Sequence, residues 1–413
     1  MPRTTHVIGA GLSGLAAAVR LSERGERVVV HEAMQQAGGR ARSYYDASTD
    51  LVIDNGNHLL LSGNHAAMSY VRALGSQAGL VGPPQADFAF IDLASGKRWT
   101  LQIGDGRLPW WMLDDSRRVP GSTVMDYVRL LPLVWASKDK TVGETIACQG
   151  PVYERLGQPL LLAALNIDPP QGSAALAGAI VRETLIAGGR ACRPLIARGL
   201  TEVLIDPALR LLVQRGAEVR FGSQLRALDL RDGKVQALEF GSDRIALEEN
   251  DAAILAVPPW IAPSLVPGLS APSQYRAIVN AHFRIAPPAD FPPMIGVLGA
   301  TVEWIFAFPD RLSVTISGAD RLLDQSREEL AALIWREVAQ VAGIAADLPP
   351  WQVVRERRAT FAATPAEDAK RPGAATKFSN LYLAGDWTDT GLPATIEGAI
   401  RSGNRAADLA HRA

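Results

Sequence analysis

The stretch HVIGAGLSGLAAAVRLSERGERVVVHEA, residues 6–33, constrains the fold of this chain more than any other part. An apolar run at residues 5–8 reads as a short buried strand, and apolar residues at helical spacing follow it. Between them lie three glycines in G-x-G-x-x-G spacing: Gly9, Gly11 and Gly14. A second strand at residues 27–31 leads to Glu32, which is placed to accept hydrogen bonds from a ribose diol. This order of strand, turn, helix, strand and acid predicts a dinucleotide-binding site.

Each residue of the turn has a physical role in such a site. Gly9 permits a tight turn, Gly11 lets the backbone approach a pyrophosphate, and Gly14 lets the helix pack closely on the strand. Leu12 and Ser13 begin the helix. Their end of the helix offers unpaired N–H groups and a partial positive charge, so we expect it to face the phosphates.

The residues after Glu32 distinguish between the two common dinucleotides. The run GGRAR, residues 38–42, comes too soon for another full helix and brings flexible backbone and guanidinium groups to the same pyrophosphate. This continuation resembles the E-A-x-x-x-x-G-G-R-x-x-S pattern of the FAD-dependent amine oxidase and phytoene desaturase superfamily. The matching residues are Glu32, Ala33, Gly38, Gly39, Arg40 and Ser43. The resemblance implies FAD as the cofactor.

Composition excludes several classes of protein. With 413 residues the chain exceeds one ordinary core, so two lobes are expected. The 42 basic and 43 acidic residues leave no net field to attract nucleic acid. Cys148 and Cys192 stand far apart and outside any C-x-x-C, which predicts neither a disulfide framework nor a metal site and fits a reducing compartment.

No segment reads as a leader peptide or a membrane span. The first predicted strand begins close to Met1, so a cytoplasmic location is expected. The apolar run at residues 252–269 contains prolines that rule out a continuous helix. Residues 108–136 combine Trp110, Trp111 and nearby arginines, a composition typical of a peripheral membrane contact. The same residues could instead line or cover an apolar substrate pocket, and the two interpretations are compatible.

The patterns along the chain predict an α/β fold with a Rossmann-like FAD-binding domain of the glutathione reductase type. A second, α+β substrate domain with an antiparallel sheet is expected, because residues 87–103 read as a hairpin and residues 277–317 as further strands. Residues 252–257 form a bare apolar strand typical of a parallel sheet. The FAD-binding domain is therefore expected to be discontinuous, with residues 1–81, 196–260 and 374–413, and the substrate domain to comprise residues 82–195 and 261–373.

Two further segments are expected to contact the cofactor. Gly56, Asn57 and His58 lie in DNGNHLLL, which resembles the superfamily segment that runs beneath the isoalloxazine ring. His58 could donate a proton or serve only as a hydrogen-bonding wall, and we favour the wall because one histidine near a motif is no catalytic signature. In folds of this type a strand crosses the adenine side, with Val219 as the expected backbone contact.

The C-terminal segment is expected to return to the cofactor. Gly385 and Asp386 follow a short apolar strand, and Asp386 is placed for the ribityl or phosphate region. A helix begins after them, and its expected cofactor contacts are Pro393, Ala394, Thr395 and Ile396. The N–H groups of this helix would face the flavin pyrimidine, where charge accumulates when the ring is reduced.

Six segments in the same order resemble the hydroxysqualene dehydroxylases, a family first described as squalene-associated FAD-dependent desaturases. They are GGRARS (38–43), DNGNHLLL (54–61), LLLAALNIDP (160–169), LAVPPW (255–260), RERRATFAATP (355–365) and LYLAGDWTDTGLPATIEGAIRSG (381–403). The resemblance covers nearly the whole chain. Asn57 departs from it, because Gln is expected before the histidine, and this puts only fine geometry near the flavin in doubt.

The resemblance implies a reductive step in squalene and hopanoid biosynthesis. The allylic hydroxyl of hydroxysqualene leaves as water, and hydride from reduced flavin N5 replaces it to give squalene. The protein must then protonate the departing oxygen, hold the carbon and exclude water. Candidate proton donors are His58 and Glu356, although for Glu356 and its neighbours Arg357 and Arg358 an ion-pair network between domains is favoured. The chain has no second G-x-G-x-x-G for a nicotinamide, so an external electron donor is expected.

Three other functions remain open at this point. A carotenoid-type desaturase would use the same flavin in the oxidising direction on a similar polyene. An amine oxidase is disfavoured because the apolar middle of the chain offers little to recognise a cation. An isoprenoid-binding escort protein would use this fold without flavin chemistry, and retention of a yellow flavin through gel filtration would exclude it.

Overall fold

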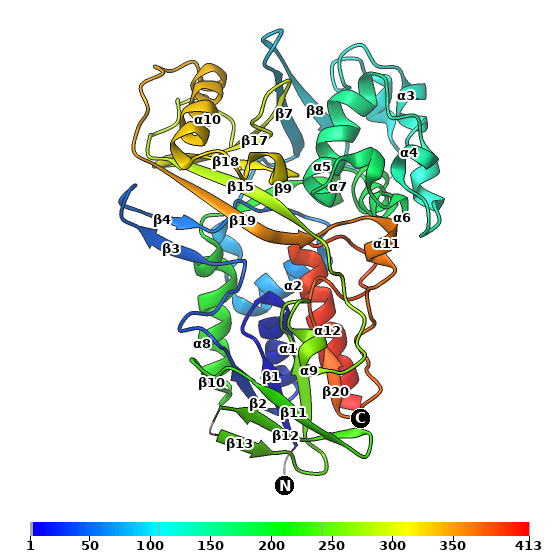
Figure 1. Cartoon of the computed structure of the whole chain (residues 1–413). Coiled ribbons are helices and arrows are strands. Elements are labelled where there is room, and N and C mark those ends of the chain that lie inside the picture. Colours follow the sequence, from blue (N-terminus) through cyan, green and yellow to red (C-terminus); the bar gives the residue numbers. More distant parts are fainter. Residues whose placement is uncertain (1–2, 107, 242, 413) are drawn as a thin grey trace.

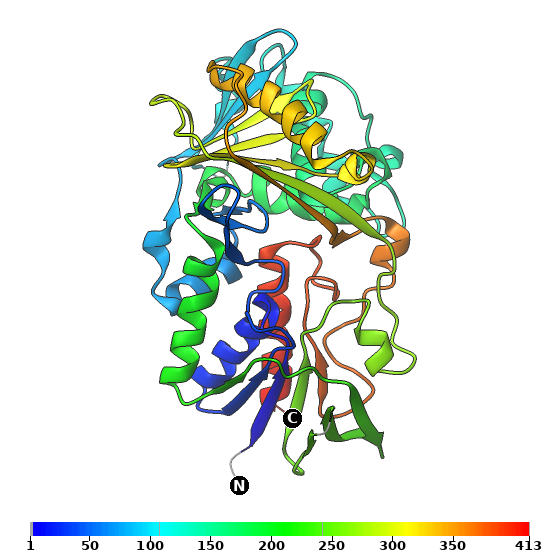
Figure 2. The same ribbon diagram turned by 60° about the vertical axis from the view of Figure 1, so that its left-hand side comes forward.

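The chain folds into two lobes that meet along a broad junction (Figure 1). The computed structural model describes residues 3–106, 108–241 and 243–412. Both chain termini lie at the base of one lobe, which is built on a parallel sheet, and the other lobe contains a larger mixed sheet with helices on both faces (Figures 1 and 2). The predicted fold class, a Rossmann-like domain with an α+β partner, is confirmed.

The parallel sheet of the first lobe is assembled from distant parts of the sequence. Its strands, in spatial order, are β10 (Glu218–Arg220), β2 (Arg27–His31), β1 (Thr4–Ile8), β14 (Ala252–Leu255) and β20 (Leu381–Leu383). Every neighbouring pair is parallel. Val7 and Ile254 face the helix side, whereas Ile8 and Leu255 face the other side, so the central strands are buried on both faces.

Helices cover one face of this sheet and a small antiparallel meander covers the other. The helices are α1 (Leu12–Glu23), α2 (His65–Leu74), α8 (Asp206–Gln214) with the π-helical turn η7 (Thr201–Ile205) before it, and α12 (Ile396–Arg412). The meander comprises β11 (Ala227–Arg231), β12 (Lys234–Phe240) and β13 (Asp243–Ala246). Phe240 stacks on His31 with ring centroids 4.4 Å apart, which fixes the meander against β2.

Helices α1 and α12 pack closely because small residues line their contact. A Cβ atom on Gly403 would lie 2.1 Å from the carbonyl oxygen of Ser13. Only glycine allows this approach, so the C-terminal helix directly supports the start of α1. The first and last segments of the chain therefore form one structural unit.

The second lobe is organised on a seven-stranded sheet. Its strands, in spatial order, are β19 (Trp351–Phe361), β15 (Tyr275–Phe283), β18 (Arg311–Ile316), β17 (Trp304–Phe308), β16 (Met294–Leu298), β7 (Ala86–Asp92) and β8 (Lys97–Ile103). The expected hairpin and the expected strands after residue 277 thus share one sheet, joined by the parallel pair β16 and β7. Strand β19 was not predicted, since its charged RERR run hides the alternation of a strand.

Helices pack on both faces of this larger sheet. One face carries α10 (Arg327–Ala342). The other face carries an apolar helical region. Its α-helices are α3 (Val124–Val128), α4 (Val142–Thr145), α5 (Gln158–Leu165), α6 (Ala174–Val181) and α7 (Gly189–Cys192). It also contains the π-helical turns η4 (Tyr153–Gly157) and η6 (Arg182–Ile186) and the 3₁₀ turns η2 (Trp110–Leu113) and η3 (Leu131–Trp135). Residues 124–135 form the short helix α3 and the 3₁₀ turn η3 rather than one continuous helix, because Pro132 interrupts the chain there.

Shorter elements connect the lobes. They are the hairpin β3 (Ser43–Asp46) and β4 (Leu51–Asp54), the small sheet β5 (Leu59–Leu61), β9 (Pro194–Ala197) and β6 (Leu80–Val81), and helices α9 (Ala262–Leu265) and α11 (Pro365–Asp368). All strands of the parallel sheet fall inside the segments predicted for FAD binding, although β9 crosses the expected boundary after residue 195. Within the described residues, no helix combines the length and apolarity that crossing a bilayer requires.

Candidate cofactor and substrate site

The three glycines of the first turn differ in what surrounds them. A Cβ on Gly14 would lie 1.9 Å from the carbonyl oxygen of Gly9, and a Cβ on Gly9 would lie 2.5 Å from that of Ala256. A Cβ on Gly11 would meet no atom within 4 Å. Gly9 and Gly14 are therefore required by packing within the protein, whereas Gly11 borders open space.

The N-terminus of α1 is available to an anion. Gly11 precedes Leu12 as the capping residue and makes no side-chain cap, and the first turn of α1 contains no acidic residue. The N–H groups of the first turn of α1 thus keep their partial positive charge, and they adjoin the open space at Gly11. This arrangement suits a pyrophosphate.

Glu32 is held rigidly at the end of β2, beside the same turn. One carboxylate oxygen accepts the N–H of Ala10 at 2.7 Å, and the other accepts that of Met34 at 2.9 Å. The backbone carbonyl of Glu32 accepts the N–H of Ser223 at 2.8 Å. Each carboxylate oxygen retains a lone pair for a ribose hydroxyl, and the neighbouring Ala33 is exposed.

The second glycine pair touches the first turn. The N–H of Gly38 donates to the carbonyl of Ala10 at 2.8 Å, and a Cβ on Gly39 would lie 3.5 Å from the Cα of Gly11. Gly38 has φ +109° and Gly39 has φ +56°, conformations that favour glycine. The two motifs, about 30 residues apart in sequence, thus form one continuous backbone surface.

Arg40 connects this surface to the C-terminal segment. Its guanidinium donates to Asp386 at 2.7 Å and to the carbonyl of Ala359 at 2.6 Å. Burial lowers the pKa of Arg40, but the carboxylates of Asp386 and Glu356 together outweigh it and raise this pKa above its ordinary value. The Arg40 side chain is nevertheless 38% accessible, which places this charge at the edge of open space.

Helix α12 begins at Ile396, and this end of the helix points to the junction between the two lobes (Figure 1). Gly385 donates its N–H to Ser402 at 2.9 Å, and a Cβ on Gly385 would lie 2.3 Å from the indole nitrogen of Trp387. Thr395 caps α12 by accepting the N–H of Gly398 at 3.0 Å. Pro393 and Ala394 lead into this cap, and Ile396 is the first helical residue.

The segment Gly56, Asn57 and His58 links the first lobe to the seven-stranded sheet. Asn57 donates its backbone N–H to the side-chain oxygen of Asn280 at 3.3 Å, and its side-chain nitrogen donates to the carbonyl of Val314 at 3.1 Å. A Cβ on Gly56 would lie 3.1 Å from Asn280. Sequence motifs did not reveal Asn280, since it lies between apolar residues in strand β15 and matches no motif.

The environment of His58 disfavours the charged form of its ring. Its Nδ1 lies 2.8 Å from the carbonyl oxygen of Gly56, which can only accept, so Nδ1 carries the hydrogen and Nε2 presents a lone pair. Burial lowers the pKa of His58 from its ordinary value. The side chain of His58 is nevertheless only half-buried by accessible surface. A side chain that is surrounded by protein yet partly accessible is expected to line a cavity inside the molecule.

Glu356 belongs to a polar network between the lobes. Its carboxylate accepts a hydrogen bond from Asn55 at 3.4 Å and contributes to the raised pKa of Arg40. The guanidinium of Arg358 lies 5.0 Å from the ring centroid of Trp260. These contacts support the interpretation of this stretch as a structural network.

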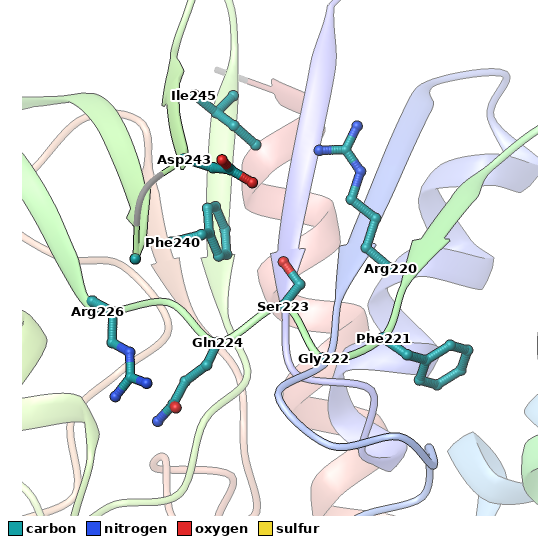
Figure 3. Close-up of a pocket in the computed structure, with 10 residues that line it drawn as sticks. Arg220, Phe221, Gly222, Ser223, Gln224, Arg226, Phe240, Asp243 and Ile245 are labelled. Carbon is teal, nitrogen blue, oxygen red and sulfur yellow. The ribbon is translucent and has the colours of Figure 1, made fainter.

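The segment expected on the adenine side contains strand β10 and the loop that follows it. Val219 lies inside β10, paired with Val30, whereas the loop after β10 reaches Glu32 through Ser223. Figure 3 shows this loop beside an open pocket of about 500 Å³ between β10 and the meander, with Arg220 and Phe240 on its walls. Among the described residues, no group of three or more His, Cys, Asp or Glu side chains could hold a metal ion.

Comparison with known proteins agrees with this geometry. The model of the flavin-containing amine oxidoreductase family matches residues 12–411. The chain belongs to this family. It is 64% identical to a hydroxysqualene dehydroxylase of Rhodopseudomonas palustris, over 99% of this chain and 98% of the relative. It is 59% identical to a hydroxysqualene dehydroxylase of Sinorhizobium fredii, over 99% of both chains. Within the flavin family, the chain is thus a member of the hydroxysqualene dehydroxylase group.

A solved structure supports the same fold. Cyclohexylamine oxidase from Brevibacterium oxydans superposes with a TM-score of 0.73 at 18% identity, covering 100% of this chain and 99% of that one. The flavin cofactor predicted from sequence is confirmed by the family. The residues of this flavin oxidoreductase fit it, because open space at Gly11, an uncapped helix end, the Glu32 carboxylate and the Arg40 guanidinium all adjoin one surface.

Proposed function

We propose that this chain is an FAD-dependent hydroxysqualene dehydroxylase, which reductively removes the allylic hydroxyl of hydroxysqualene to give squalene. The observation that carries the proposal is 64% identity, over nearly the full length of both chains, to a relative with that name. The second lobe supports it, since the helical region that packs on the seven-stranded sheet is strongly apolar.

Residues from both ends of the chain would hold the cofactor. Gly11, Leu12 and Ser13 would bind the pyrophosphate, Glu32 the ribose, and Arg40 and Asp386 the region between phosphate and flavin. When bound, FAD supplies the reducing hydride. We propose the remaining predicted contacts as part of the same site: Gly9, Gly14, Ala33, Gly38, Gly39, Gly56, Asn57, His58, Val219, Gly385, Pro393, Ala394, Thr395 and Ile396.

The protein's own contribution is to orient the substrate and exclude water. The neutral state of His58 supports a role as a hydrogen-bond acceptor in the wall of the site, rather than as the proton donor. Its Nε2 can orient a hydroxyl or a water molecule. Glu356 is engaged with Asn55 and near Arg40, which supports a structural role between the lobes.

Product analysis under anaerobic conditions tests this function. Holoenzyme with chemically reduced flavin is mixed with hydroxysqualene, and the flavin spectrum and the extracted lipids are followed together. We expect reoxidation of flavin in step with squalene formation. Reduction of oxidised flavin by a polyene, without loss of the hydroxyl, would instead identify a desaturase.

We further propose that the electrons come from an external donor. The chain contains one G-x-G-x-x-G turn, which the FAD would occupy. Steady-state turnover should therefore require an added reductase or free reduced flavin. Efficient turnover with NADPH alone would contradict this proposal.

We propose that the protein is cytoplasmic and contacts the membrane surface through the helical region. Large apolar side chains are exposed there, at Leu108, Trp110, Leu113, Met125 and Trp135. Trp110 is 68% and Trp135 78% exposed, and Arg129 lies nearby in sequence with a 65% exposed side chain. A substrate as hydrophobic as hydroxysqualene would enter the site from a bilayer.

Vesicle flotation tests the membrane contact. The double variant Trp110→Ser, Trp135→Ser should bind anionic vesicles at least several-fold more weakly than the parent. The matched control is Val213→Ser, because Val213 is a 65% exposed apolar residue on α8 in the other lobe. Equal flotation of all three proteins would contradict the proposal.

A further inference from the structure

One row of side chains crosses the seven-stranded sheet, and it starts beside Asn57. Strand register places five residues in line on consecutive strands: Thr315, Trp304, Gly296, Phe90 and Trp99. Asn280 is the partner of Thr315 on the next strand. Residues that pair in register point to the same face of a sheet, so the row is continuous.

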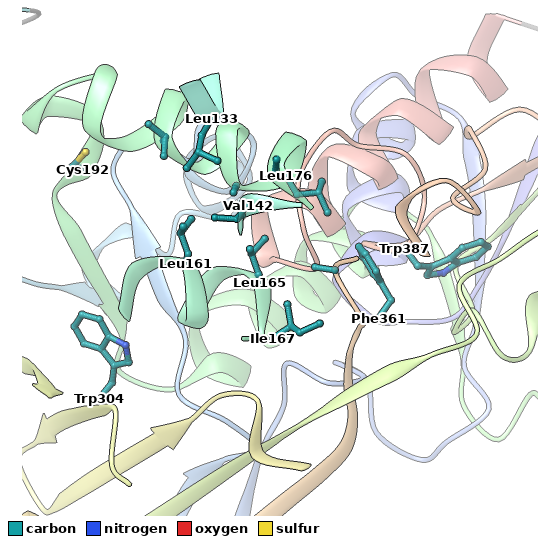
Figure 4. Close-up of a cluster of buried hydrophobic side chains, with 14 of the residues drawn as sticks. Leu133, Val142, Leu161, Leu165, Ile167, Leu176, Cys192, Trp304, Phe361 and Trp387 are labelled. Atoms are coloured by element: carbon teal, nitrogen blue, oxygen red, sulfur yellow. The ribbon is translucent and has the colours of Figure 1, made fainter. Parts of the chain in front are cut away.

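The row lies on the face opposite α10. Residues such as Val314 and Ile305, which alternate with the row, pack with α10. Phe90 and Trp304 instead belong to the apolar cluster that contains Leu161 and Leu165 of α5. Figure 4 shows Trp304 on the sheet side of this cluster and Leu161 and Leu165 on the helix side.

The outer part of the row is aromatic. Phe90 stacks on Trp99 and meets Trp304 edge to face, with ring centroids 5.6 Å apart in both pairs. Gly296 makes this possible, since a Cβ there would lie 2.6 Å from the Phe90 ring. Four strand spacings separate Thr315 from Trp99, a length of about 19 Å.

The inner end of the row is polar and locks one amide in place. The side-chain nitrogen of Asn57 donates to the carbonyl of Val314 at 3.1 Å and to the hydroxyl of Thr315 at 3.3 Å. The hydroxyl of Thr315 in turn donates a hydrogen bond to the side-chain oxygen of Asn280 at 2.8 Å. Because a carbonyl can only accept, the orientation of the Asn57 amide is fixed.

Two buried polar atoms beside this end have no hydrogen-bond partner among the described residues. They are Oδ1 of Asn57, an acceptor, and Nε1 of Trp304, a donor. Trp304 is 8% exposed. Asn57 contacts Thr315, and Trp304 is the strand partner of Thr315. Buried polar groups are normally paired, so an unpaired acceptor and an unpaired donor on either side of Thr315 suit a ligand group that both donates and accepts. A hydroxyl is the simplest such group.

We propose that Asn57 and Trp304 hold the hydroxyl of the substrate, and that Phe90 and Trp99 hold one isoprenoid arm along the row. The inference rests on the proposed function and adds the residues that recognise the substrate. Asn57 accepts the hydroxyl hydrogen, and the Trp304 N–H donates to its oxygen. The arm then follows the aromatic rings away from the cofactor segment.

Binding of two ligands to the oxidised holoenzyme tests the proposal without turnover. Hydroxysqualene and squalene are titrated, and the change in the flavin absorbance gives a dissociation constant for each. Trp304→Phe removes the N–H together with part of the ring; the lost ring affects both ligands alike, whereas the lost N–H should reduce the preference for hydroxysqualene about 3- to 10-fold, as expected for one neutral hydrogen bond. Asn57→Ala should reduce the same preference, and Trp99→Ala should weaken both ligands equally.

The matched control is Trp351→Phe, which alters a tryptophan of the same sheet that packs on the α10 side. It should leave both constants unchanged. An unchanged preference in Trp304→Phe and Asn57→Ala, with normal flavin content, would overturn the inference. Turnover of hydroxysqualene by the parent protein is measured in parallel, because its absence would reject the proposed function itself.

Discussion

The contrast between Gly11 and Gly14 yields a sharp test of the cofactor site. Gly11 has φ −74° and ψ 175°, which alanine adopts without strain, and an added Cβ meets no atom within 4 Å. Replacing a glycine N-cap by alanine costs about 0.5–1 kcal/mol, and reduced freedom of the unfolded chain returns about 0.4–1 kcal/mol. Gly11→Ala should therefore leave the unfolding free energy of the apoprotein within about 0.5 kcal/mol of the parent.

The same methyl group should obstruct the cofactor. If the pyrophosphate lies on the backbone at Gly11, the Cβ displaces it from the N–H groups of α1. Loss of one hydrogen bond to a charged group costs about 1.5–3 kcal/mol, which is roughly a 10- to 150-fold weaker FAD affinity. Gly14→Ala should behave differently, because its Cβ would lie 1.9 Å from the carbonyl of Gly9 and destabilise the apoprotein by about 1–3 kcal/mol or more.

Two measurements separate these cases. Thermal and denaturant unfolding of the apoproteins gives stability, and fluorescence titration with FAD gives affinity. Gly373→Ala is the matched control, since Gly373 is exposed and also borders open space, but lies outside the phosphate turn. The reasoning is refuted if Gly11→Ala binds FAD as the parent does, or if it destabilises the apoprotein as much as Gly14→Ala.

Three further outcomes are expected. Burial raises the pKa of Glu303 to about 7, so ionisation of this side chain destabilises the fold as the pH rises from about 4.5 through 7. The variant Glu303→Gln should therefore be more stable than the parent by up to about 3 kcal/mol at pH 8. Urea unfolding measures this difference, which should vanish at pH 4. Gly403→Ala should separate α12 from α1 and lower the melting temperature and the FAD content together. His58→Gln should retain turnover within about tenfold, since a general acid would be worth 100-fold or more; a larger loss, with normal flavin content, would restore His58 as the proton donor.

The phosphate turn and the acid that follows it could be predicted because these parts are local in sequence. The strand, turn, helix and acid of residues 5–32 occupy one βαβ unit, whose geometry depends on neighbours a few residues apart. Gly38 and Gly39 follow directly and need only a short turn to touch Gly11. Backbone conformation and short-range hydrogen bonds suffice to specify such a site.

Tertiary structure alone decided how the substrate side is built. Alternation of apolar residues identified several strands, yet it could not place β7 beside β16, or align Phe90 with Trp304 across Gly296. Strand partners and register depend on contacts between segments about 200 residues apart, and many pairings satisfy the same local pattern. The sequence therefore did not predict that Asn280 and Thr315 contact Asn57, because the two residues come together only when β15 and β18 pair.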